Sequence, residues 1–230
     1  GADEQRSREE EELMRDLLWV FDDDAERAAA VYKRCRRSLI RHGKQKRQSF
    51  LDVVEVMGGD RQRAQQLVEQ NPQVLRSTLV ASAFEDVASR VMAGDKERAR
   101  KLVEQYPELL RSTQIAPAFA FLVSEVMGGD RERALGLVEQ SPKMLTSKNI
   151  KQAWPDLCDE VMEGDADRAL QLVEQDPQML SSTLVASSFE DVVSGVMAGD
   201  KEKARQLVEQ HPDLLASAQV PEAFAFLVSD

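Results

Sequence analysis

A nine-residue motif recurs five times at a spacing of 35 residues, and this period constrains the fold more than any other feature of the chain. It begins as LVEQNPQVL at residues 67–75 and returns as LVEQYPELL, LVEQSPKML, LVEQDPQML and LVEQHPDLL. A fixed period of about 20–50 residues is typical of helical arrays, in which each unit buries its apolar face against its neighbours. The period therefore predicts five repeats, at 56–90, 91–125, 126–160, 161–195 and 196–230.

Each repeat is expected to contain two helices and a short third turn. In the second repeat, apolar residues fall on one stripe of a helix, at Ile115, Ala118, Phe119, Leu122, Val123 and Val126. A Gly-Asp pair then ends this helix and caps the next, because Gly tolerates the left-handed conformation and Asp accepts a backbone hydrogen bond. The second helix carries LVEQ and ends before the Pro, which costs little only at the start of a helix. We therefore predict an all-α fold, an elongated α-solenoid superhelix of helix-turn-helix repeats without β-sheet.

One position inside the motif varies, between the fixed Gln and the fixed Pro. Its occupants are Asn71, Tyr106, Ser141, Asp176 and His211. Asn, Ser and Asp are good helix caps, so the position is interpreted first as a tolerant, partly exposed cap. The alternative is a specificity position that presents one side chain per repeat to a partner.

Residues 1–47 stand outside the array at 48–230 and are predicted to form a helical hairpin that caps it. Within them, the segment 33–47 holds eight bases and no acid. Three interpretations stay open: a solvated face near a helix C-terminus, a contact with acidic helices of this chain or of a partner, or a nuclear-localisation or nucleic-acid patch. The candidate basic patch comprises Arg34, Arg36, Arg37, Arg41, Lys44, Lys46 and Arg47.

The charge distribution disfavours nucleic acid as a partner of the array. The chain has a formal net charge of −11, and the fourth repeat alone carries seven acids against one base. Neutralising phosphates requires the opposite sign. We expect no binding of nucleic acid by the array itself.

No catalytic or metal-binding motif is present: there is no CxxC, HExxH, GxSxG or P-loop. Cys158 is interpreted as a small core residue. Cys35 is interpreted as lying on the buried side of its helix with Val31 and Leu39, with a reactive thiol among the surrounding bases as the alternative. We therefore expect no enzyme, no cofactor, no metal and no membrane-spanning helix. Two cysteines favour a reducing compartment, hence an intracellular protein of the cytoplasm or nucleus, with a secreted effector as the alternative.

The repeats resemble several helical-repeat families. GDKERA at 94–99 looks like the helix-turn-helix corner of tetratricopeptide repeats, and the 35-residue length equals that of pentatricopeptide repeats. Residues 107–145 are similar to the mitochondrial transcription termination factor repeat, with its Pro-x-x-Leu start and Phe-Leu pair. Residues 128–145 also look like the second half of a transcription activator-like effector repeat. The last two families bind nucleic acid, so the resemblance implies an alternative function: a nucleic-acid-binding array with one variable residue per repeat.

The preferred function is a scaffold that binds a protein or peptide on a repeated surface. Two residues after the aromatic centre of the first helix, other repeats carry Asp, but Phe121 and Phe226 stand there, with the three-repeat period of the sequence. We expect these rings to be exposed and to be the first candidates for partner contact, with Tyr106 and His211 the second. Self-association through the C-terminal end is also expected, because Val220 and Phe224 should face a second helix that the sequence does not contain.

Overall fold

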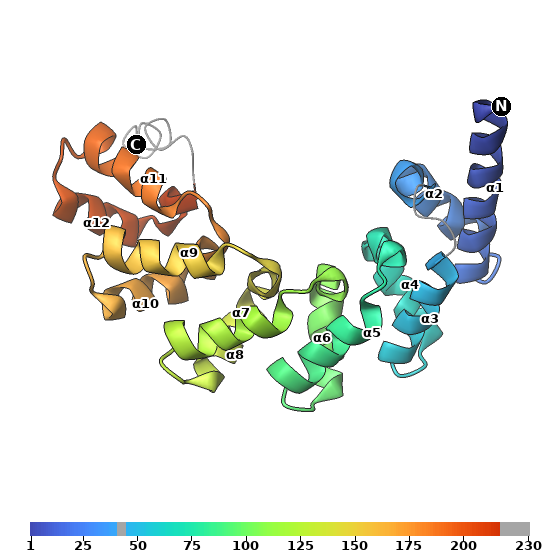
Figure 1. Cartoon of the computed structure of the whole chain (residues 1–230), viewed down its shortest axis with the longest axis horizontal. Helices are drawn as coiled ribbons and strands as arrows, with labels where there is room; N and C mark the ends of the chain where they lie inside the picture. Colours follow the sequence, from blue (N-terminus) through green and yellow to red (C-terminus); the bar gives the residue numbers. More distant parts are fainter. Residues whose placement is uncertain (41–44, 217–230) are drawn as a thin grey trace. The chain divides into compact units, whose positions relative to one another are not determined.

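The computed structural model describes residues 1–40 and 45–216, and every regular element in them is helical (Figure 1). This confirms the all-α prediction for the described part of the chain. The chain divides into two compact units, residues 1–115 and 116–230. The boundary falls at the start of one helix of the array.

A buried aromatic residue stands in the first helix of repeats one to four, as the apolar stripe predicts, and in the helix that precedes the first repeat. These helices are α3 (Lys46–Val56), α5 (Val80–Glu85), α7 (Ile115–Phe121), α9 (Ile150–Pro155) and α11 (Val185–Asp191). Their aromatic side chains are all nearly inaccessible to solvent: Phe50, Phe84, Phe119, Trp154 and Phe189. The equivalent Phe224 lies outside the described residues.

All but the first of these helices continue into a π-helical turn. The π segments are η3 (Asp86–Val91), η5 (Leu122–Val126), η7 (Asp156–Val161) and η9 (Val192–Val196). In η3 the N–H of Met92 donates to the carbonyl of Val87, five residues back, at 2.9 Å. In α3 the corresponding bond runs four residues back, from Met57 to Val53. The helical prediction is therefore confirmed, but the wider turn was not foreseen.

A tight corner joins the first helix to the second. Two consecutive left-handed residues make the turn, for example Ala93 at φ 50° and Gly94 at φ 93°. The next residue is the predicted Asp cap: the carboxylate of Asp95 accepts the backbone N–H of Arg98 at 3.0 Å. The second helices that begin in this way are α4 (Arg61–Gln70), α6 (Lys96–Gln105), α8 (Arg131–Gln140), α10 (Ala166–Gln175) and α12 (Lys201–Gln210).

The predicted short third element is a 3-10 helix that opens on the fixed Pro. These helices are η2 (Pro72–Arg76), η4 (Pro107–Arg111), η6 (Pro142–Thr146), η8 (Pro177–Ser181) and η10 (Pro212–Ala216). Pro is tolerated there because the first turn of a helix needs no donor from it. Each 3-10 helix buries a Leu in the core, such as Leu75 and Leu110.

The N-terminal hairpin consists of α1 (Ala2–Val20) and α2 (Ala25–Ile40), and its corner is built like those of the repeats. Asp22 and Asp23 are both left-handed, at φ 55° and 65°. Asp24 then accepts the backbone N–H of Arg27 at 3.2 Å, as the capping Asp does in each repeat. Where the repeats place Pro, α2 carries Arg36, so this helix continues to Ile40 instead of breaking.

Candidate partner-binding surface

Ion pairs join consecutive second helices in a fixed register. In each pair the Arg stands three residues after the capping Asp of one helix. It forms an ion pair with a Glu that stands nine residues after the capping Asp of the next second helix. The pairs are Arg27 with Glu69, Arg63 with Glu104, Arg133 with Glu174, and Arg168 with Glu209. The hairpin helix α2 supplies the first arginine. The register of these pairs therefore includes the hairpin as well as the repeats.

Two of these arginines bind a second carboxylate. Arg63 donates to Glu97 at 2.8 Å, and Arg168 donates to Glu202 at 2.9 Å. The hydrogen bond from Arg63 is the main reason that the pKa of Glu97 lies below its ordinary value, with a second bond from Arg100. Arg168 lowers the pKa of Glu202 in the same way. These carboxylates are exposed, so solvent limits what the pairs contribute.

Hydroxyl and amide groups make further links between neighbouring repeats. The hydroxyl of Ser77 donates to the carbonyl of Leu110 at 2.7 Å, and that of Ser182 donates to Leu215 at 3.3 Å. Ser77 also accepts the N–H of Leu79, so one hydroxyl both starts the next helix and joins two repeats. A buried hydroxyl needs such partners to offset its lost hydration.

The variable position before Pro is a cap in part of the array. The side chain of Asn71 accepts the backbone N–H of Gln73 at 3.1 Å, and that of Asp176 accepts the backbone N–H of Gln178 at 3.2 Å. Ser141 was expected to cap as well, and this was wrong: it is only 6% exposed and makes no capping bond. The backbone angles of Ser141, φ −140° and ψ 78°, are close to those of Asn71, so the backbone does not account for the missing bond.

Tyr106 and His211, the two occupants that are poor caps, are both half-buried. Asn71 also donates to Glu108 of the following repeat, at 2.5 Å. At Asn71, therefore, the variable side chain contacts the neighbouring repeat as well as its own 3-10 helix. The residue at position 71 is therefore constrained by its contact with the next repeat as well as by its own cap.

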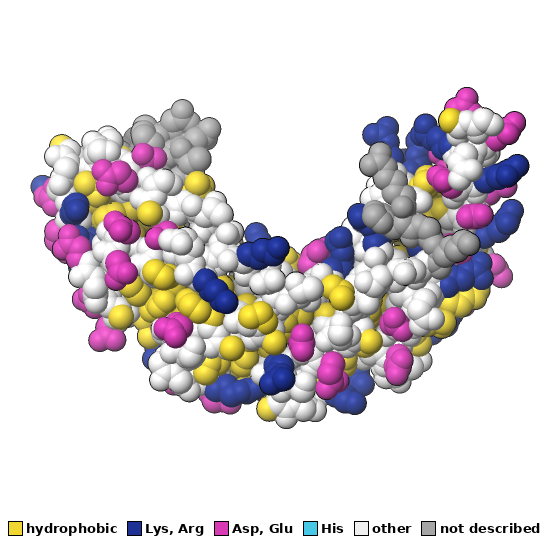
Figure 2. Space-filling model, viewed as in Figure 1, with side chains coloured by type: hydrophobic (Ala, Val, Ile, Leu, Met, Phe, Trp, Pro, Cys, Tyr) yellow, Lys and Arg dark blue, Asp and Glu magenta, His cyan; other side chains and the backbone are white. Residues whose placement is uncertain are grey.

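The outer side of α7 differs chemically from the outer sides of α5 and α11. Its solvent-facing positions are occupied by Ala116, Pro117, Ala120 and Phe121. At the positions of Ala120 and Phe121, α5 and its π turn carry Glu85 and Asp86. Figure 2 shows hydrophobic side chains gathered over α7 and α9. We call these four residues the α7 apolar face. Phe226, the equivalent of Phe121, lies outside the described residues.

Phe121 is half-buried, so the expectation that this ring is exposed was wrong. Asp86 and Asp156, which occupy the same place in other repeats, are also half-buried. Half-burial is therefore a property of this helix position in three repeats and is not peculiar to the Phe.

The basic segment does not act as one patch. Lys46 is buried, with only 4% of its surface exposed. This burial lowers the pKa of its amine, while the nearby carboxylates of Asp16 and Glu12 act in the opposite direction and raise it. Arg47 pairs with Asp16 at 2.7 Å and lies over the ring of Trp19. Arg34 donates to the backbone carbonyl of Glu69 at 2.5 Å. The inclusion of Lys46 in an exposed patch was therefore wrong, because the hairpin packs over it.

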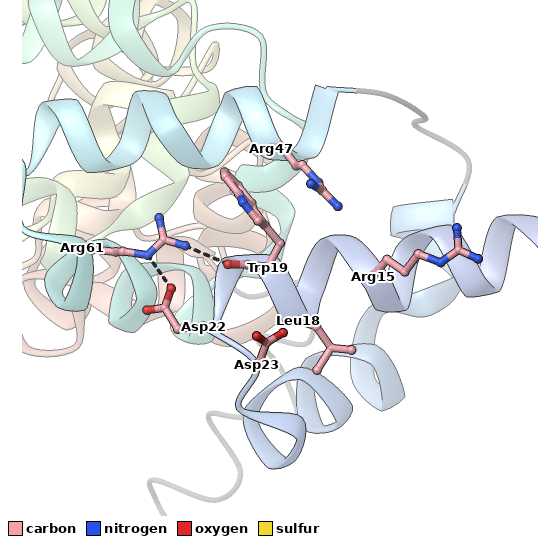
Figure 3. Close-up of a pocket in the computed structure, with 7 residues that line it drawn as sticks. All are labelled: Arg15, Leu18, Trp19, Asp22, Asp23, Arg47 and Arg61. Atoms are coloured by element: carbon pink, nitrogen blue, oxygen red, sulfur yellow. Dashed lines mark hydrogen bonds and ion pairs between the residues drawn. The ribbon is translucent and has the colours of Figure 1, made fainter.

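A hollow of about 420 Å³ lies beside Trp19 and is lined by charged residues of both signs (Figure 3). Figure 3 shows Trp19 between Arg47 and Arg61, with Arg61 bound to Asp22 and to the carbonyl of Trp19. The guanidinium groups of Arg47 and Arg61 are thus engaged in holding the hairpin corner to α3 and α4. This hollow is a structural junction.

The remaining bases of the segment are open or outside the described chain. Lys33, Arg36 and Arg37 are exposed on α2, and Arg41 and Lys44 fall outside the described residues. Both cysteines are half-buried and unpaired. Burial raises the pKa of Cys158 to about 11, with Asp159 adding to the effect, so this thiol is protonated at neutral pH.

Within residues 1–40 and 45–216, no three His, Cys, Asp or Glu side chains are grouped as a metal site requires. No helix in the same residues is both long and apolar enough to cross a bilayer. No family model matches the chain, and no curated protein or solved structure is similar to it.

Proposed function

We propose that the chain is a non-catalytic scaffold that binds a protein or peptide partner, and that its five 35-residue repeats stack as an α-solenoid. The stacking is supported by the recurrent register of the Arg–Glu pairs and of the serine-to-carbonyl bonds. Contacts that recur at the repeat period are what a solenoid requires, because each unit is stabilised by its neighbours.

The α7 apolar face carries the proposal for binding. It replaces the acidic pair of α11, Glu190 and Asp191, with Ala120 and Phe121. Half-buried aromatic rings are frequent anchors of protein interfaces, because they bury area at low conformational cost. An uncharged face on a strongly acidic chain suits an apolar partner segment, and gives no attraction to phosphate groups.

Site-specific photocrosslinking tests this function directly. A photoreactive phenylalanine analogue replaces Phe121, and in a matched control it replaces Asp191, which holds the same helix position in the fourth repeat. After illumination in cells of the native host, we expect an adduct at position 121 that protease removes and nuclease does not. The control should give none.

Phe121→Asp provides the second arm. Asp occupies this position in three other repeats, so the helical circular dichroism should be unchanged. Binding of the crosslinked partner should weaken by more than about 1 kcal/mol, the usual threshold for an interface residue that matters. Normal binding by this variant, or a nuclease-sensitive adduct at position 121, would exclude the α7 apolar face as a protein-binding site.

A further inference from the structure

The Arg–Glu register distinguishes two sides of α2 and of the second helices. One side, on α2, α4, α8 and α10, carries the Arg at the third residue after the capping Asp and contacts the next of these helices along the chain. The other side, on α4, α6, α10 and α12, carries the Glu at the ninth residue and contacts the previous one. We call the second of these the receiving side. For α4 the receiving side is covered by α2, through Arg27 and Glu69.

The receiving side of α2 is reversed in charge. Lys33 stands nine residues after Asp24, where the later second helices carry Glu. Arg37 stands four residues further on, at the place of Gln73 and Glu108 in the next two repeats. Those two residues contact the preceding repeat: Gln73 donates to Ser38 at 2.7 Å, and Glu108 accepts from Asn71 at 2.5 Å.

Lys33, Arg36, Arg37 and Ile40 follow one another at i, i+3, i+4 and i+7, so they share one face of α2. The three bases are exposed, and no ion pair joins them to another residue within 1–40 and 45–216. Ile40 is half-buried beside them. Arg36, Arg37 and Ile40 also line a hollow of about 580 Å³ whose other side is α1. This face is therefore open, basic and apolar at one end.

We propose that this face of α2 docks an acidic amphipathic helix of a partner protein. The same side of α4 receives a helix that offers Arg to Glu69, so a helix that fits α2 must offer carboxylates to Lys33 and Arg37. An apolar residue of that helix would rest on Ile40. This site is separate from the α7 apolar face and goes beyond the function proposed above.

A nucleic acid fits this face less well than an acidic helix. The stripe from Lys33 to Ile40 spans about 10 Å of helix, which is room for only a few phosphates. Polyanion affinity grows with the number of phosphates neutralised.

The test uses the full chain and a synthetic probe. The probe is a fluorescent alanine-based peptide of about 18 residues, long enough to be helical, with Glu and Leu on one face. Comparison probes carry Gln in place of Glu, or are single-stranded oligonucleotides. Fluorescence anisotropy should show that the Glu peptide binds, that the Gln peptide does not, and that added salt weakens binding.

Two variants and one control locate the site. The triple variant Lys33→Gln/Arg36→Gln/Arg37→Gln should weaken binding of the Glu peptide about tenfold, as expected for the loss of three exposed charge pairs. Lys33→Glu places on α2 the residue that later repeats already carry, so it should fold normally and also weaken binding. The control Lys96→Gln/Lys101→Gln/Lys151→Gln changes the net charge equally and should leave binding unchanged.

Several results would overturn the proposal. Failure of the Glu peptide to bind, or equal binding of the Gln peptide, would show that α2 does not recognise an acidic helix. If the control variant weakened binding of the Glu peptide as much as the triple variant does, the binding would be general charge attraction and not recognition by α2. Tighter binding of the oligonucleotide, abolished by the triple variant, would assign the face to nucleic acid. Circular dichroism of each variant confirms that its fold is retained.

Discussion

Left-handed backbone conformations at the corners are occupied in part by residues that disfavour them. The first left-handed position holds Gly58 and Gly128 in two repeats, but Ala93, Glu163 and Ala198 in the others. A residue with a Cβ costs roughly 1 kcal/mol or more in this conformation. Ala93→Gly should therefore raise the free energy of unfolding by about 1 kcal/mol, measured by urea denaturation.

The matched control is Ala81→Gly, at an exposed position inside α5. Gly within a helix loses more conformational entropy on folding than Ala, so this change should lower stability by about 0.5–1 kcal/mol. The two substitutions are chemically identical and differ only in backbone conformation. If Ala93→Gly destabilises the protein as much as Ala81→Gly does, the left-handed strain at this corner is absent.

How much the sequence could predict at this scale depends on whether a feature is local. The Asp caps and the Pro start of each 3-10 helix follow from neighbouring residues, and both are confirmed. The burial of Ser141 and Phe121 depends on tertiary packing, so the sequence of a single repeat does not show it. The burial of Lys46 likewise depends on how the hairpin packs.

One extra residue accounts for the π turns among the first helices. From its buried aromatic to the last Val, α3 reads FLDVVEV, whereas the second of these helices reads FEDVASRV between Phe84 and Val91. Both ends hold equivalent places, since the aromatic is buried and the corner follows the Val. The added residue must therefore be absorbed within the helix, and an i→i+5 turn does this. Aligning the first helices on their buried aromatic residue, rather than on the 35-residue period, shows the extra residue in the sequence.

Deletion of Ser89 should convert the π turn of this helix into regular α-helix, as in α3. Ser89 is exposed, so little packing is lost, and we expect a loss in unfolding free energy of less than about 2 kcal/mol. Deletion of Lys101, exposed in the regular helix α6, is the control. It turns the following residues by about 100° and removes Leu102 and Val103 from the core. Thermal unfolding by circular dichroism should stay cooperative only for the Ser89 deletion; equal damage by both would refute this account.

The N-terminal hairpin shows where sequence reasoning fell short for the molecule as a whole. Asp24-Ala25-Glu26-Arg27 is close to Asp165-Ala166-Asp167-Arg168, and both segments cap a helix and place an Arg for pairing. This similarity was available in the sequence, but the absence of Pro after it concealed the relation. The charge of the receiving side could not be interpreted until the pairing register was known, because the register arises from contacts between helices far apart in the sequence.

Removal of one whole repeat tests the stacking register. Deletion of residues 161–195 brings Glu209 to the place of Glu174, so Arg133 regains a partner at the same spacing. The shortened protein should keep its ellipticity per residue and unfold cooperatively at a somewhat lower temperature, because repeat arrays lose stability one interface at a time. Deletion of residues 161–178, about half a repeat, should instead abolish cooperative unfolding, since it joins helices out of register. If the 35-residue deletion unfolds the protein as completely as the shorter one, the repeats are not equivalent stacked units, and the proposed solenoid is wrong.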